Sequence, residues 1–297
     1  MIKVGCCGFP TSMKKYFENF NLVELNSTFY QYPRTETVQG WREKAPKNFE
    51  FTVKTHQDVS HKSKMKVEEV SLKAFEQMKQ ICKILNSKIL LIQTPGSFGP
   101  DRLTDAEQFF KRVNHGNVVL VWETRGPAWE KTETHKRLGQ VLEALNVTHV
   151  TDPFKVMPAY TGEISYFRLH GLGKQMYYYQ YSDGELRKLK ELIAAYEDKD
   201  TYVLFNNLSM FEDAMRFMNY LSKGSFPTIT GSVGLASARE IAQKVRYPIS
   251  RSMLIKRVGW RLVELEDGRQ VRFETVLANL PSTTYQNVEE LLGHVRY

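Results

Sequence analysis

The sequence contains little cysteine and no long apolar run. Only three of its 297 residues are cysteine (Cys6, Cys7 and Cys82), and neither their number nor their spacing suits a disulfide framework. We therefore expect a reducing, cytoplasmic setting. No stretch approaches the ~18 consecutive apolar residues of a membrane span, and residues 1–10 have the pattern of a strand and a turn, not of a targeting segment. These absences argue against a membrane partner.

Acidic residues are fewer than basic ones. The 41 Lys and Arg residues against 33 Asp and Glu residues give a net charge of +8. Such a surplus favours anionic partners, which include both small anionic ligands and nucleic acid. The hydrophobic fraction of 42% is that of a globular chain, long enough for one large domain with a small appendage.

Short β-rich runs alternate with amphipathic helical segments over the first two thirds of the chain. The predicted strands are 2–5, 22–26, 50–54, 88–93, 118–123, 147–152, 164–170 and 202–206. The predicted helices between and after them include 12–20, 35–44, 68–85, 105–113, 135–145, 183–196 and 210–221. Because strands that alternate with helices pair in parallel, this order predicts an α/β fold, a TIM-type (β/α)₈ barrel.

An open, doubly wound sheet is the alternative architecture. It predicts a glycine-rich phosphate-binding turn after the first strand. The segment that follows this strand, Gly5-Cys6-Cys7-Gly8, matches that fingerprint poorly. The barrel is therefore the preferred prediction.

The C-terminal segment differs from the rest in pattern and charge. Residues 261–266 and 269–274 flank Asp267-Gly268, which is a strong hairpin signal. Residues 287–295 have the pattern of a terminal helix. We predict a barrel domain over residues 1–248 and a small C-terminal module of a β-hairpin plus a helix over residues 249–297.

Charged and polar residues stand at the ends of the predicted strands. In a barrel these ends converge on one rim, where barrel active sites are built. Strand ends are also polar simply because loops begin there, but charged groups such as Lys54, Glu123 and Arg168 are costly near a core without partners. The whole set therefore indicates a site. Its predicted substrate contacts are Asn26, Thr28, Tyr30, Lys54, Arg125, Arg168, Asn206 and Asn207.

Glu123 and His170 are the candidate acid–base pair of this site. They lie on strands that are not neighbours, which would leave room for a substrate between them. Guanidinium groups suit planar oxyanions, so Arg125 and Arg168 would bind the anion together with Lys54. The alternative is a structural salt bridge between Glu123 and Arg168, with His170 only filling space.

Several segments resemble the YecE-like family, also called domain of unknown function DUF72. The first block, Glu24–Tyr30, is similar to its Glu-x-Asn-Ser-Thr-Phe-Tyr run, and Pro33–Trp41 and Phe51–Lys54 are similar to the segments that follow. Further matches are Glu123-Thr124-Arg125 with Trp129, Phe167–Gly171 and Phe205-Asn206-Asn207. The resemblance spans most of residues 1–221. It implies a TIM-type barrel and implies no particular activity.

Three further features give weaker indications. Gly171, Gly173 and Lys174 put flexible backbone and a cation after the seventh strand, where barrels often bind phosphate. Glu24, Glu123, Asp152 and His170 could hold a divalent metal, but neighbouring cations favour an ion-paired site, so we predict no cofactor. Nucleic-acid binding through the basic surface is the alternative function, and a non-enzymatic scaffold is a further one.

Overall fold

The computed structural model describes residues 1–295, which form two compact units. The first unit comprises Met1–Leu169 and Leu189–Asn206. The second comprises His170–Lys188 and the chain from Asn207 onward. The predicted domain boundary at residue 248 falls inside the second unit and stays a prediction.

Eight parallel strands form the sheet of the first unit, in the order β6-β5-β4-β3-β2-β1-β8-β7. They are β1 (Ile2–Cys7), β2 (Leu22–Leu25), β3 (Glu50–Lys54), β4 (Ile89–Gln93), β5 (Val119–Glu123), β6 (Thr148–Val150), β7 (Ile164–Leu169) and β8 (Asp200–Phe205). The two edge strands, β6 and β7, lie close together: the Arg168 N–H donates to the Thr151 carbonyl at 2.9 Å. The strands thus form a nearly closed barrel, and the predicted TIM-type fold is confirmed.

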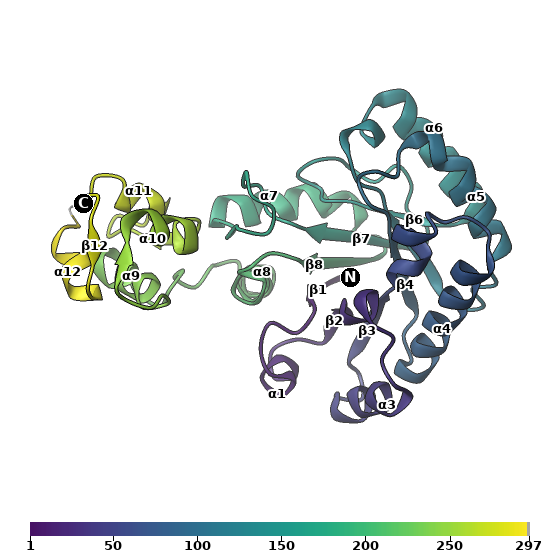
Figure 1. The fold of residues 1–297 in the computed structure, drawn as a ribbon, viewed down its shortest axis with the longest axis horizontal. Coiled ribbons are helices and arrows are strands. Elements are labelled where there is room, and N and C mark those ends of the chain that lie inside the picture. The colour runs from purple at the N-terminus through teal and green to yellow at the C-terminus, as the bar shows by residue number, and fades with distance from the viewer. Residues whose placement is uncertain (296–297) are drawn as a thin grey trace. The chain divides into compact units, whose positions relative to one another are not determined.

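Helices connect the strands and cover the outside of the sheet, as Figure 1 shows for α3, α4, α5 and α6. The helices up to β8 are α1 (Met13–Phe17), α2 (Ser27–Tyr30), α3 (Thr35–Lys44), α4 (Glu69–Leu85), α5 (Leu103–Arg112), α6 (Thr132–Leu145) and α7 (Asp183–Ile193). In α4, the buried Phe75, Met78, Cys82 and Leu85 recur with the helical period. Asn86 then ends α4 in the left-handed conformation, at φ 53°.

The interior of the barrel is apolar in its middle and charged at one end. Val121 and Tyr166 belong to one buried cluster that fills the barrel. Side chains two residues apart on a strand share a face, so Glu123 and Arg168 follow them toward the C-terminal strand ends on the same inner side. The alternation of the strands therefore carries charged groups into the barrel mouth.

The predicted second strand ends earlier than its sequence pattern indicates. Glu24, Asn26 and Thr28 have the spacing of side chains on one face of a strand, but β2 ends at Leu25 and α2 begins at Ser27. The Thr28 hydroxyl lies 3.0 Å from the Leu25 carbonyl and 2.7 Å from the Lys54 carbonyl, to both of which it donates. This local capping turns the chain into a helix before the strand can continue.

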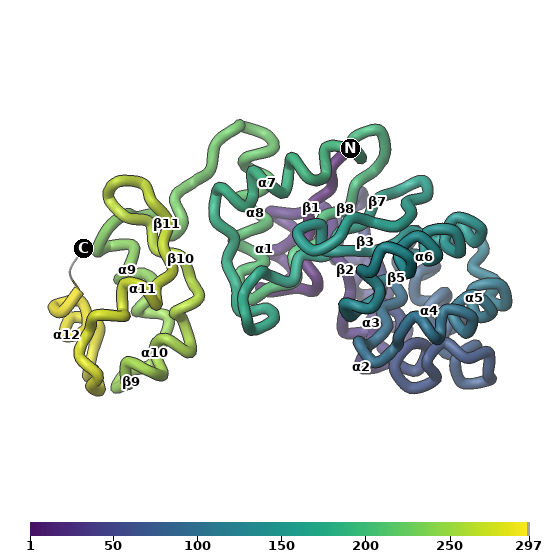
Figure 2. The backbone as a smooth tube through the Cα atoms, turned by 90° about the horizontal axis from the view of Figure 1, so that it is seen from above, coloured from purple at the N-terminus to yellow at the C-terminus, as the bar shows by residue number. Residues whose placement is uncertain are grey.

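The C-terminal part of the second unit has its own hydrophobic core. Helix α8 (Met210–Lys223) precedes it, and its elements are α9 (Gly234–Ala242), β9 (Ile249–Ser250), α10 (Arg251–Val258), β10 (Leu262–Glu264), β11 (Gln270–Arg272), α11 (Phe273–Leu277), β12 (Thr284–Tyr285) and α12 (Val288–Gly293). Figure 2 shows these C-terminal elements close together, in green to yellow. Their buried side chains form one cluster that extends from Ala238 to Val295.

The predicted hairpin is present but shorter than expected. Strands β10 and β11 pair antiparallel, and Gly268 takes a φ of +81° in the turn between them. The expected second strand, 269–274, is too long, because Phe273 already begins α11. Phe273 is fully buried in the C-terminal cluster, so packing has overridden the strand pattern at this point.

Candidate active site

Arg168, at the C-terminal end of β7, is the centre of a buried charge cluster. Its Nε and Nη2 donate to the two carboxylate oxygens of Glu24 at 3.0 and 2.8 Å, and its Nη1 donates to Glu123. Only 1% of Arg168 is exposed. Burial by itself lowers the pKa of Arg168, but the Glu123 and Glu24 carboxylates outweigh it and hold that pKa above its usual range. The guanidinium is therefore charged and bridges two strands.

Glu24 is held by a second set of donors. The Tyr166 hydroxyl donates to its Oε2 at 2.8 Å, and the Thr52 hydroxyl lies 2.8 Å from that of Tyr166. Glu24 and Thr52 are register partners on β2 and β3, which places both at one level of the barrel. Burial, and next the Glu24 charge, raise the pKa of the Tyr166 phenol. Tyr166 is thus a neutral donor that fixes the carboxylate.

Glu123 lies between two guanidinium groups. Besides Arg168, Arg125 donates from Nε to Glu123 Oε1 at 3.0 Å. Arg125 follows β5 in the chain, and about a fifth of its side chain is exposed. The salt bridge between Glu123 and Arg168 that the sequence left open is therefore present. Arg125 connects this buried pair with the surface.

Lys54, the last residue of β3, is a buried amine that forms no ion pair with any of residues 1–295. Its Nζ donates to Gln93 Oε1 at 2.6 Å and lies 4.1 Å from the centre of the Phe29 ring. Burial, and next the positive charge of Arg168, lower the pKa of Lys54 from 10.5 to about 8. The two carboxylates that could offset this charge, Glu24 and Glu123, are both engaged by Arg168.

The loop after β3 contains two histidines, of which His61 lies near this cluster. The His61 ring packs edge-on against Phe29, with centroids 4.7 Å apart, and Ser60 Oγ lies 2.9 Å from its Nδ1. Burial, and next the charges of Lys54 and Arg125, lower the pKa of His61 to about 4. His56 stacks on Tyr32 at 3.8 Å. His61 is therefore a neutral imidazole beside Lys54 near pH 7.

The predicted contacts at the end of β2 differ in their surroundings. Asn26 follows β2 directly, and its buried Oδ1 has no hydrogen-bond partner among residues 1–295. Thr28 is buried and bound to main-chain carbonyls. Tyr30 is 68% exposed. Of these three side chains, Asn26 has the free acceptor that a substrate donor would need.

The remaining predicted residues are divided between the two units. Asn206 directly follows β8 in the first unit, and its N–H donates to the Leu169 carbonyl at 2.8 Å. Asn207 belongs to the second unit and donates from Nδ2 to Asp213 at 2.7 Å. His170 also belongs to the second unit, with its ring 5.9 Å from that of Tyr177. The pairing of Glu123 with His170 would join the units and stays a prediction.

The predicted phosphate loop has internal contacts of its own. The Gly171 N–H donates to the Tyr181 hydroxyl at 2.9 Å. Gly171 has a φ of +90°, and a Cβ there would come within 2.4 Å of Tyr179, so glycine is required for packing. Lys174 is exposed. These contacts explain the glycine at position 171, and phosphate binding by the loop stays a prediction.

The structure adds little support for a metal site or for a nucleic-acid site. In the part of the chain that the structure describes, no three His, Cys, Asp or Glu side chains are grouped to hold a metal ion. In the tail, Arg251 donates to the Leu280 carbonyl at 2.6 Å, and Arg261 lies 4.9 Å from the Trp260 ring. These arginines serve internal contacts, and nucleic-acid binding stays a prediction. None of the helices formed by residues 1–295 is long and apolar enough to cross a membrane.

The fold and the cluster define a class, a (β/α)₈ barrel protein with a buried charged site at the C-terminal strand ends. The chain belongs to the family described as "Protein of unknown function DUF72", whose model matches residues 8–228. A second model, "Family of unknown function (DUF5789)", matches residues 232–297. The resemblance inferred from the motifs is therefore confirmed.

Individual relatives extend this comparison. The chain is 31% identical to the UPF0759 protein YecE of Escherichia coli over 142 residues, 47% of this chain and 51% of YecE, so the match spans about half of that relative. It is 24% identical to the UPF0759 protein YunF of Bacillus subtilis, over 66% of this chain and 80% of YunF. A DUF72 family structure from Thermotoga maritima aligns with a TM-score of 0.60 at 26% identity, covering 75% of this chain and all of that one.

Sequence reasoning missed His61 and gave Gln93 no role. The Gln93 amide oxygen accepts a hydrogen bond from Lys54, and His61 packs against Phe29, which also contacts Lys54. A signal was present, because His56 and His61 lie two and seven residues after Lys54, the last residue of a predicted strand. Residues 58–62 form a π-helical turn, a form often found at functional sites.

Proposed function

We propose that this protein is an enzyme that binds a small anionic substrate, bearing phosphate or carboxylate, at the strand ends and performs acid–base chemistry on it without a metal ion. The observation that carries the proposal is the Lys54 amine, which is buried at the C-terminal strand ends of a barrel and has no carboxylate partner in the described part of the chain. An unpaired buried ammonium is costly. An anionic ligand would remove that cost.

The charges of the cluster support an anionic ligand. Glu24 and Glu123 contribute two negative charges, whereas Arg168, Arg125 and protonated Lys54 contribute three positive ones. Among these five side chains, the positive charges exceed the negative ones by one. We assign the anion contacts to Lys54 and Arg125, and the orienting contact to Asn26.

The same contacts argue for a metal-independent site. Arg168 occupies both oxygens of Glu24 and one oxygen of Glu123, and Arg125 occupies the other. A metal ion would have to displace these guanidinium groups to reach the carboxylates. Arg168 is therefore assigned to holding Glu24 and Glu123 in place, while Glu123 and His170 remain the proposed acid–base pair.

Anion binding can be measured by the stabilisation that a ligand gives. Inorganic phosphate or oxalate at about 100 times its Kd should raise the free energy of unfolding by about 2.7 kcal/mol. In Lys54→Met the increment should disappear. The measurement is urea unfolding at pH 7 with and without the anion.

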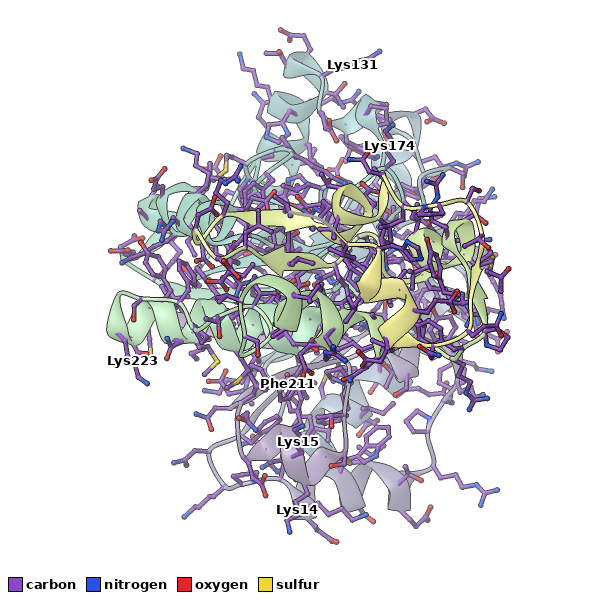
Figure 3. All side chains as sticks on the ribbon, turned by 90° about the vertical axis from the view of Figure 1, so that its left-hand side faces the viewer. Lys14, Lys15, Lys131, Lys174, Phe211 and Lys223 are labelled. Carbon is purple, nitrogen blue, oxygen red and sulfur yellow. The ribbon has the colours of Figure 1, made fainter. Side chains whose placement is uncertain are left out.

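Lys14→Met is the matched control, since Lys14 lies on α1 and points away from the ribbon in Figure 3. It should keep the full increment. Equal increments in wild type and Lys54→Met, or none in wild type with either anion, would refute the proposed site.

A further inference from the structure

Lys54 differs from the ordinary surface lysines of this chain in both burial and partners. Its exposed fraction is 8%, and its contacts are the Gln93 amide and the Phe29 ring. No carboxylate oxygen lies within 4.0 Å of its Nζ in the residues that the structure describes. Lys54 is thus a buried amine that neither an ion pair nor bulk water holds in its charged form.

A neutral base stands close to this amine. His61 and Lys54 both contact Phe29, at 4.7 and 4.1 Å respectively. With its pKa lowered to about 4, chiefly by burial, His61 is a neutral imidazole near pH 7 and can accept a proton. The His61 Nδ1 is 2.9 Å from the Ser60 hydroxyl. An amine nucleophile and a proton acceptor therefore share one aromatic neighbour.

We infer that Lys54 is a nucleophile that forms a Schiff base with the carbonyl group of a small anionic oxo compound, with His61 transferring the protons. This inference deepens the proposed function and rests on it, because Arg125 would hold the anionic group of the same substrate. Lysines that are desolvated and placed near other cations are the ones suited to this chemistry. The substrate class is a 2-oxo acid or a phosphorylated aldehyde or ketone.

The step balances without an oxidant, a reductant or a metal ion. The neutral Lys54 amine attacks the carbonyl carbon, the C–N bond forms as the C=O π bond breaks, and a first N–H proton passes through His61 to the oxygen, which gives a carbinolamine. His61 then accepts the second N–H proton and returns it to the hydroxyl oxygen. That oxygen leaves as water, and the C=N bond forms. One proton from solvent then gives the iminium ion, an electron sink for the acid–base chemistry.

The inference is tested by reductive trapping of the full-length protein with glyoxylate and sodium cyanoborohydride at pH 7. Peptide mass spectrometry would follow the labelling rate of each lysine. A pKa of about 8 in place of 10.5 gives an amine about 300 times more neutral form at pH 7. Allowing for burial, we expect Lys54 to be labelled at least about tenfold faster than the exposed Lys14, Lys15, Lys131 and Lys223, which Figure 3 labels.

Two variants separate nucleophilic catalysis from simple binding. Lys54→Arg keeps the positive charge, so it should still be stabilised by oxalate, yet the fast labelling should disappear. His61→Gln should be stabilised by oxalate like the wild type but be labelled about tenfold more slowly.

The outcomes distinguish the inference from the proposed function. If oxalate stabilises the wild type but Lys54 is labelled no faster than Lys14, the Schiff-base inference is wrong and the anion site stands. If oxalate binding and fast labelling are both absent, both proposals fail. If another lysine is labelled fast in Lys54→Arg, the assignment of Lys54 as the nucleophile is also wrong.

Discussion

Strand β3 begins with Glu50 and ends with Lys54, and its two ends illustrate two uses of a lysine charge. At the first end, Lys3 Nζ donates to Glu50 at 2.7 Å, to Asp200 at 2.9 Å and to the Tyr202 hydroxyl at 3.1 Å. At the other end, about 13 Å away along the strand, Lys54 has an amide and an aromatic ring as partners.

The pKa values of the two lysines move in opposite directions. Burial lowers the pKa of Lys3, but its hydrogen bonds to Glu50 and Asp200 outweigh burial and raise it above its usual range. For Lys54, burial and the charge of Arg168 outweigh the Glu123 and Glu24 carboxylates and lower the pKa. The paired lysine supports the fold, whereas the unpaired one is available for chemistry. This matches the general division of barrels into a structural and a functional end.

The largest expected effect is on the centre of the charged end. Arg168→Leu leaves the Glu24 and Glu123 carboxylates buried without their main partner, so the free energy of unfolding should fall by about 3–5 kcal/mol. Urea unfolding at pH 7 measures it. Adding Glu24→Gln to this variant should restore part of the loss, because one uncompensated charge is then removed. A loss below about 1 kcal/mol would show that these charges are not mutually dependent.

Lys54→Met should stabilise the protein near pH 7. Lowering a pKa from 10.5 to about 8 corresponds to about 3 kcal/mol of destabilisation in the charged form. Losing the Gln93 hydrogen bond offsets about 1 kcal/mol, which leaves a net gain of about 2 kcal/mol. Urea unfolding of the variant and the wild type provides the comparison.

The sign of the pH dependence follows from the lowered pKa of Lys54. The folded wild type binds its proton more weakly than the unfolded chain, so its stability falls as the pH drops from about 10.5 to about 8. The advantage of Lys54→Met is therefore full below pH 8 and vanishes above pH 10.5. The groups that set this window are Arg168, Glu123, Glu24 and Arg125. A variant advantage that grows with pH would contradict this assignment.

The smallest effect is expected at the structural end. Lys3→Met removes a partly exposed network, so the free energy of unfolding should fall by about 1 kcal/mol. Anion binding at the strand ends should not change. Calorimetric titration with oxalate checks the second point, and a loss of binding in Lys3→Met would end the division between the two barrel ends.

The sequence was sufficient to predict where the charged residues of the site lie. Strand alternation and parallel pairing dictate that Glu123 and Arg168 face the barrel interior at its C-terminal end. Their contact could be given only as one of two alternatives, because it depends on the way β5 and β7 meet across the barrel. For the same reason, the unpaired state of Lys54 follows only from the fact that Arg168 binds both carboxylates.

After β2 and after β3, local turns give a structure that the alternation of side chains does not predict. Thr28 continues the alternation of β2 in sequence, but its hydroxyl binds two carbonyls and the chain forms α2 instead. His61 contacts Phe29 because it lies in the π-helical turn η1 (Asp58–Lys62). The hydrophobic periodicity of the sequence does not predict such a turn. Such features depend on hydrogen bonds between segments, which a single sequence does not reveal.

The most direct test of the central claim is the titration of individual lysine amines. Spectra of the protein with ¹³C-labelled lysine ε-carbons, assigned with Lys54→Met and Lys3→Met, follow both groups from pH 6 to pH 12. We expect Lys54 to titrate near pH 8 and Lys3 to stay protonated beyond pH 10.5. A Lys54 amine that titrates at or above 10.5 would contradict it.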